Sequence, residues 1–270
     1  MSTKEQSVTL LRKNKLAQVE AFRSIGMTDV DENMRASDFA RRIVWAAGLL
    51  DICLAADRVK VIDGVDTIET LYFTKAEWSS LSATQQLKFN KKGLRVRAYG
   101  HSFTLAPSDA SDDAGSYTMA WSNHVNVDNM ENRAFGAAYN DFAGAANTLA
   151  VINELSGTTG SQNVKGCPAA QAAASYKAYS IDSQDGYDDV SDWHLPGLGC
   201  LFICLKLKSE INDAFTFFWS ADACMLKTVN YWSSTEYDTT SVWTVNPGSC
   251  FMQTSSKSSK LRVRPVCDES

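Results

Sequence analysis

Residues 231–266 combine regularly placed aromatic residues with a high content of serine and threonine. Of these 36 residues, 13 are Ser or Thr, and they are interspersed with the rings of Tyr231, Trp232, Tyr237 and Trp243. A flexible linker can have such a Ser/Thr content, but it lacks ring anchors and β-branched strand segments. The segment therefore predicts folded β-structure near the C-terminus.

Two stretches of this segment alternate between apolar and polar residues, at 243–246 and at 261–264. This is the period of a strand with one buried face. We expect Pro265 to end the second strand, large side chains to point inward, and small polar ones to point outward. The outward positions are then either a solvated tail or a rigid contact surface.

The order of the predicted elements favours an α+β fold. Residues 58–72 predict a β-hairpin with Asp63-Gly64 at its turn, and Thr74 begins a capping box before a short helix with Trp78. Further strands are predicted at 94–98 and 102–105, and helices at 147–155, 168–179 and 198–215. Strands, then helices, then strands is not the alternating order of a parallel sheet.

Residues 1–57 predict an N-terminal helical region that precedes a main domain over 58–270. Its stronger helix spans 35–56, where Ser37 is a suitable cap and apolar residues recur at helical spacing, namely Phe39, Ile43, Ala46, Leu50 and Leu54. This helix can pack on its own domain or on a second copy of the chain. We favour its own domain and keep a homo-oligomer as an alternative.

Charge and hydropathy exclude several classes of protein. The net charge is −5, so we expect no nucleic-acid partner. The longest apolar stretch, 43–56, contains Asp51 and is too short to span a bilayer, and the polar N-terminus predicts no secretory signal peptide. Seven cysteines without paired spacing favour a reduced compartment, such as the bacterial cytoplasm.

Motifs for catalysis or metal binding are incomplete. Residues 100–104 (GHSFT) lack the second glycine of a nucleophile elbow, and Cys200 and Cys204 have no second ligand pair nearby. Five aspartates do not match a calcium loop, at Asp182, Asp185, Asp188, Asp189 and Asp192. We therefore predict no catalytic residue, no cofactor and no metal, and we expect both thiols to be buried.

Three motifs carry a resemblance to a known family. Residues 139–148 (YNDFAGAANT), 192–199 (DWHLPGLG) and 231–236 (YWSSTE) occur in this order. Together with the closing 263–266 (VRPV), they resemble the target proteins of diversity-generating retroelements, which occur in phages and gut bacteria. The resemblance implies a C-type-lectin-like domain, with antiparallel sheets and two main helices, whose variable region is 231–266.

In that family, adenines in selected template codons are mutated during reverse transcription. The resemblance implies a variable ligand-binding face at the positions that such mutation of an AAC codon can reach. These positions are Asp238, Thr239, Thr240, Ser241, Thr244, Asn246, Ser249, Phe251, Thr254, Ser255, Ser256, Ser258, Ser259 and Leu261. The scaffold is expected to include Trp193, Trp232 and Trp243, with Trp232 and Trp243 close together under the variable face.

The leading hypothesis is a hypervariable binding protein, displayed on a phage virion, that recognises a protein or polymeric surface ligand on a host cell. The first alternative is an enzyme of the related formylglycine-generating type, which needs a reactive cysteine pair such as Cys250 and Cys267. The second is a bacterial surface adhesin. A reverse-transcriptase gene and an adenine-differing near-repeat of codons 231–266 beside this gene would favour the leading hypothesis.

Overall fold

The computed structural model describes residues 50–123, 127–159, 164–180, 188–220 and 224–269. The chain divides into two compact units, residues 1–51 with 97–100 and residues 52–96 with 101–270. The contacts discussed below lie within the second unit. Of the N-terminal helical region predicted over 1–57, the residues before 50 lie outside the described residues.

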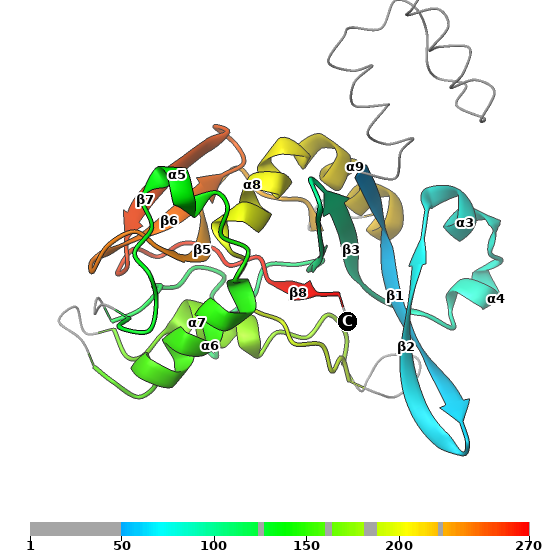
Figure 1. Cartoon of the computed structure of the whole chain (residues 1–270). Helices are drawn as coiled ribbons and strands as arrows, with labels where there is room; N and C mark the ends of the chain where they lie inside the picture. Colours follow the sequence, from blue (N-terminus) through cyan, green and yellow to red (C-terminus); the bar gives the residue numbers. More distant parts are fainter. Residues whose placement is uncertain (1–49, 124–126, 160–163, 181–187, 221–223, 270) are drawn as a thin grey trace, which may run out of the picture. The chain divides into compact units, whose positions relative to one another are not determined.

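The described residues form an α+β structure with antiparallel sheets and several helices (Figure 1). The strands are β1 Leu50–Ile62, β2 Val65–Phe73, β3 Asn90–Ala98, β4 His101–Leu105, β5 Tyr231–Glu236, β6 Ser241–Asn246, β7 Phe251–Ser256 and β8 Val266–Asp268. The helices are α3 Lys75–Ser80, α4 Ala83–Gln86, α5 Phe135–Ala138, α6 Gly144–Leu155, α7 Pro168–Ala174, α8 Leu198–Lys206 and α9 Lys208–Trp219.

One sheet has the strand order β2-β1-β3-β4-β8. The predicted hairpin is confirmed: Ile62 of β1 pairs with Val65 of β2, and both Asp63 (φ 51°) and Gly64 (φ 80°) have positive φ. Positive φ at both central positions belongs to a type I′ turn, whose twist matches that of the flanking strands. The capping box is also confirmed, because the side chains of Thr74 and Glu77 each accept a hydrogen bond from the other residue's backbone N–H. The predicted short helix follows, and it buries Trp78.

The helix predicted over 35–56 is wrong for residues 50–56, which belong to β1. Leu54, Ala55 and Ala56 are all fully buried. A strand buried on both faces has a continuous apolar run, and such a run also places apolar residues at helical spacing. The predicted boundary at 57/58 consequently falls inside a continuous strand.

The helix predictions hold in position but not in length. Helix α6 contains the predicted 147–155, whereas α7 ends five residues before the predicted end at 179. The helix predicted over 198–215 is divided into α8 and α9 at Leu207, whose φ of −109° and ψ of 19° interrupt the helical backbone. The expected second main helix is therefore two shorter ones.

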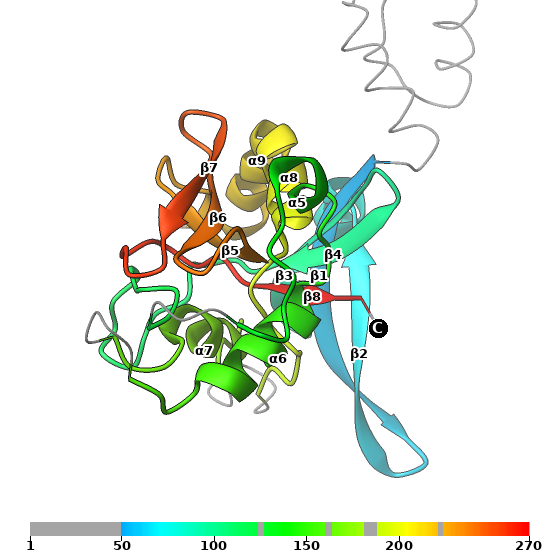
Figure 2. The same cartoon turned by 60° about the vertical axis from the view of Figure 1, so that its left-hand side comes forward.

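The other sheet has the strand order β5-β6-β7. Helices α6 and α7 lie next to each other in both views (Figures 1 and 2). One hydrophobic cluster joins these helices to the sheet. It includes Val151, Leu155, Ala169, Trp232 and Val242. This cluster buries one face of β5 and β6.

The prediction of a strand over residues 261–264 is wrong. Leu261 and Arg262 make only isolated bridges, to Met119 and Tyr231. The closing strand β8 begins after Pro265 and pairs with β4, where Val266 lies opposite Leu105. Pro265 thus precedes a strand, a position in which its missing N–H costs no ladder bond.

Candidate ligand-binding surface

The first and third sequence motifs meet at the buried carboxylate of Asp141. Its Oδ2 accepts hydrogen bonds from Thr235 Oγ1 at 2.8 Å and from Asn147 Nδ2 at 2.9 Å, and its Oδ1 accepts one from the backbone N–H of Ala143 at 3.0 Å. Asp141 and Asn147 belong to the first motif and Thr235 to the third. A carboxylate that is buried but fully hydrogen-bonded avoids the desolvation penalty of an unpaired charge.

The second motif joins the same network through its backbone. Leu198 N–H donates to Thr235 Oγ1 at 2.9 Å, and Leu195 N–H donates to Thr148 Oγ1 at 3.0 Å. Ser234 N–H donates to the carbonyl of Pro196 at 2.8 Å. Segments that lie up to 94 residues apart in the sequence are therefore held together by direct hydrogen bonds.

The glycines of these motifs allow the segments to approach closely. A Cβ at Gly197 would lie 2.3 Å from the carbonyl oxygen of Asp141, and one at Gly144 would lie 2.6 Å from that of Leu195. Both contacts are with backbone, which cannot move aside. Any side chain at either position would push the first and second motifs apart.

The predicted burial of the three scaffold tryptophans is confirmed. Each indole N–H finds an acceptor: Trp193 donates to Asp189 at 2.5 Å, Trp232 to the Met119 carbonyl at 2.8 Å and Trp243 to the Arg133 carbonyl at 2.7 Å. A buried tryptophan whose N–H is satisfied in this way is a strong structural anchor.

Trp232 and Trp243, however, point to opposite faces of the sheet. Trp232 pairs with Thr244 across β5 and β6, so its side chain shares the face of Thr244. Trp243 directly precedes Thr244 in β6, so its side chain points to the other face of the sheet. There the centroid of its ring lies 5.3 Å from that of Tyr237 and 5.8 Å from that of Phe135. The two rings do not form a common layer under one face.

Thr244 does not belong to an exposed face, contrary to the prediction. Its exposed fraction is 0%, and its Oγ1 donates to the carbonyl of Gln253 at 3.1 Å. The polar residues of β5, 233–236, are also fully buried. The sequence pattern predicted one buried face, but β5 and β6 are buried on both.

The other predicted positions surround this buried part. Exposed ones are Thr239, Thr240, Ser249, Phe251, Thr254 and Ser256, and half-buried ones are Asp238, Ser241, Asn246, Ser255, Ser258, Ser259 and Leu261. They occupy the β5–β6 turn, the β6–β7 turn, strand β7 and the turn that follows it. Phe251, with an exposed fraction of 65%, and the nearby Tyr237, with 41%, are the large apolar residues of this surface.

Two of these side chains stabilise turns. The Asp238 carboxylate accepts hydrogen bonds from the Thr240 N–H at 2.8 Å and the Thr240 hydroxyl at 2.9 Å. Partial burial raises the pKa of Asp238, but the hydrogen bonds from Thr240 and Ser241 outweigh it, so the pKa is lowered overall. Asn246 donates to Asn230 at 2.7 Å and accepts from the Gly248 N–H at 2.8 Å.

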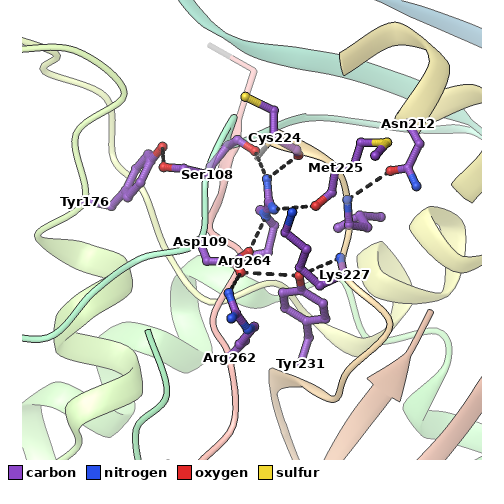
Figure 3. Close-up of polar contacts among 12 residues, drawn as sticks. Ser108, Asp109, Tyr176, Asn212, Cys224, Met225, Lys227, Tyr231, Arg262 and Arg264 are labelled. Atoms are coloured by element: carbon purple, nitrogen blue, oxygen red, sulfur yellow. Dashed lines mark hydrogen bonds and ion pairs between the residues drawn. The ribbon is translucent and has the colours of Figure 1, made fainter. Parts of the chain in front are cut away.

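A buried arginine that the sequence pattern did not predict holds the C-terminal segment (Figure 3). Arg264 is fully buried, and its guanidinium donates to Asp109 at 2.8 Å and to the carbonyls of Ala106 and Cys224, both at 3.0 Å. Arg262 donates to the same carboxylate at 2.6 Å. The alternation at 261–264 could not reveal this, because Asp109 lies more than 150 residues upstream in the sequence.

All seven cysteines are free thiols. Cys200 and Cys204 are buried, as predicted, and Cys250 is exposed. Burial raises the pKa of Cys267 to about 12. Among the described residues no group of three or more His, Cys, Asp or Glu side chains is placed to hold a metal ion.

Comparison with models of protein families gave no match, and comparison with curated proteins gave none either. Every helix in the described ranges is too short or too polar to cross a membrane.

Proposed function

We propose that this chain is a ligand-binding display protein with a C-type-lectin-like domain, diversified at its C-terminal segment by a retroelement and carried on a phage particle. The observation that carries the proposal is the hydrogen-bonded convergence of the three motifs on the linked side chains of Asp141 and Thr235. Residues that were separate sequence signals form one buried network, as expected if they share a structural role in supporting the segment that follows.

The buried network and the exposed positions of the surface are made by different residues. The network uses Asp141, Asn147 and Thr235, whereas the turns and β7 expose residues such as Thr239 and Thr254. Substitutions at exposed positions usually change stability by no more than about 0.5 kcal/mol. A surface of this kind can change its sequence without losing the fold that holds it.

The chemistry of the surface suits a macromolecular ligand. Phe251 and Tyr237 are exposed rings among small hydroxyl side chains. Aromatic anchors with adaptable Ser and Thr neighbours are typical of antibody paratopes. We propose a protein or polymeric ligand on the surface of a host cell.

The alternative of a formylglycine-generating-type enzyme receives no support from its cysteines. Cys250 is exposed, but the raised pKa of Cys267 keeps that thiol protonated near neutral pH. A reactive cysteine requires a lowered pKa and access to solvent.

The test compares adsorption to host cells of this protein and of a sibling in which Thr239, Thr240, Phe251, Thr254 and Ser256 are replaced together by residues from another variant. A matched control changes Leu149 to Ser, an exposed residue of α6 outside the surface. We expect the sibling to change host preference and the control to keep it. Identical preference for sibling and parent would exclude this surface as the binding site.

A further inference from the structure

Strand β7 is an edge strand of its sheet in the part of the chain that the structure describes. In the sheet order β5-β6-β7 it pairs with β6 alone, and no other strand of the described residues lies along its second side. Four of its six residues are exposed and the other two are half-buried. The strand contains neither charged residues nor proline, the features that usually protect an edge from pairing.

The phase of the β6–β7 ladder identifies the free backbone groups. Lys257 N–H donates to the carbonyl of Thr240 at 3.0 Å, so these two residues form a hydrogen-bonded pair. Such pairs alternate with non-hydrogen-bonded ones along an antiparallel ladder. Thr254 lies opposite Trp243 and Met252 opposite Val245, both non-hydrogen-bonded pairs, so the N–H and C=O of Thr254 and Met252 point away from β6.

The side chains of β7 are divided between the two faces of the sheet. Thr254 and Ser256 share the face of Trp243, whereas Phe251, Gln253 and Ser255 share the face of Thr244. A ligand lying flat on one face would meet only half of them. A ligand lying along the edge would meet both halves.

We propose that the ligand is an extended polypeptide segment that adds to β7 as a fourth strand of the sheet. Its backbone bonds the free groups of Met252 and Thr254, and its side chains, which alternate between the two faces, contact the exposed side chains on each. Backbone hydrogen bonds do not depend on side-chain identity, so this contact persists while the side chains of β7 change. The inference rests on the proposed function, because it specifies the ligand of the same surface.

A second copy of this chain fits the edge less well. Strand β7 is six residues long, about 20 Å, and an edge contact of that length buries much less than the roughly 1,000 Å² that a stable protein interface requires. Self-pairing would also set the small side chains of Thr254, Ser255 and Ser256 against each other, where they offer little cross-strand contact. A peptide with large side chains at alternate positions would fill that space.

The experiment selects binders for the full chain from a library of linear peptides displayed on yeast. Selected peptides are then measured against the parent, Thr254→Pro and Thr254→Ala. Proline removes the outward N–H without touching the bonds to β6, whereas alanine removes the side chain and keeps the N–H. We expect Thr254→Pro to weaken binding about tenfold or more and Thr254→Ala to weaken it less.

Hydrogen exchange on the unmodified protein gives a second measurement that needs no variant. The amides of Met252 and Thr254 should exchange rapidly in the free protein and become protected when a selected peptide binds. Failure to select any peptide, equal binding to parent and Thr254→Pro, or unchanged exchange at both amides would overturn the inference. So would a dimer that Thr254→Pro converts to a monomer, because the occupant would then be a second copy.

Host-cell adsorption separates this inference from the proposed function. If the sibling described above changes host preference but Thr254→Pro adsorbs like the parent, the surface binds its ligand without strand addition. If neither protein differs from the parent, both proposals fail.

Discussion

Glu236 and Lys257 form an ion pair in which neither side chain reaches solvent. Glu236 is the last residue of β5 and Lys257 directly follows β7, so the pair joins the two ends of segment 237–256. The Lys257 ammonium also lies 5.1 Å from the ring centroid of Trp121. Burial raises the pKa of Glu236 and lowers that of Lys257, although their mutual attraction opposes both changes.

Removal of one partner should cost more than removal of both. Lys257→Met leaves the Glu236 carboxylate buried without its counter-charge and should lower the free energy of unfolding by about 3–5 kcal/mol. The double variant Glu236→Gln, Lys257→Met has no buried charge and should lose clearly less. Urea denaturation of the three proteins measures the difference. Equal losses in the single and double variants would show that the charge of Glu236 is not the source of the cost.

Arg264 should tolerate substitution much less than Arg262. Lysine at 264 keeps the charge but cannot donate in the several directions that the carboxylate of Asp109 and the surrounding carbonyls require, so we expect a loss of about 3 kcal/mol or more. The Arg262 side chain is 30% exposed, and Arg262→Lys should cost about 1 kcal/mol or less. Thermal unfolding of the two variants provides the comparison, and similar melting temperatures would contradict it.

Replacement by lysine should destabilise the protein strongly at Thr244 and hardly at all at Thr239. Thr244→Lys places an ammonium where the threonine is fully buried, and we expect a loss of about 2–5 kcal/mol or failure to fold. Thr239→Lys changes an exposed residue of the β5–β6 turn and should stay within about 0.5 kcal/mol of the parent. Soluble yield and urea denaturation distinguish the two. A stable Thr244→Lys protein would mean that this position can be exposed after all.

Stability should fall at alkaline pH because of the buried thiols. Burial raises the pKa of Cys204 from its ordinary 9.0 to about 12, so the unfolded chain releases this proton first. The thiol therefore contributes stability that is fully present below pH 9.0 and is lost as the pH rises toward 12, by up to about 1.4 kcal/mol per pH unit. Cys204→Val removes the titrating group and should flatten the decline of the unfolding free energy above pH 9.0. An unchanged slope would assign the decline to other groups.

Local signals in the sequence predicted local structure well. The Asp63-Gly64 turn and the Thr74 capping box each depend on residues a few positions apart, and both are confirmed. The burial of Trp193, Trp232 and Trp243 followed from large rings among small polar residues. In each case the chemistry that decides the structure is contained in a short window.

The errors arose where the partner is distant in sequence. Nothing near Arg264 indicates that Asp109 receives it. Nothing near Thr244 shows that the hydrophobic cluster packs on one face of β6 while the rings of Phe135 and Tyr237 lie against Trp243 on the other. Period-two alternation reports only that neighbouring side chains differ, not how many faces of a strand are buried. The edge position of β7, on which the strand-addition inference depends, is likewise a property of the assembled sheet.

The β6–β7 turn has a consequence for how such a surface can vary. Residues 247–250 connect two strands that are already paired up to Asn246 and Phe251. Because the ends are held in place, each doubling of the connecting length costs only about 0.6 kcal/mol of closure entropy. Inserted residues would extend the reach of the turn while the paired strands below it stay in register. The surface can therefore acquire new shapes by changes in length, and not by exchange of side chains alone.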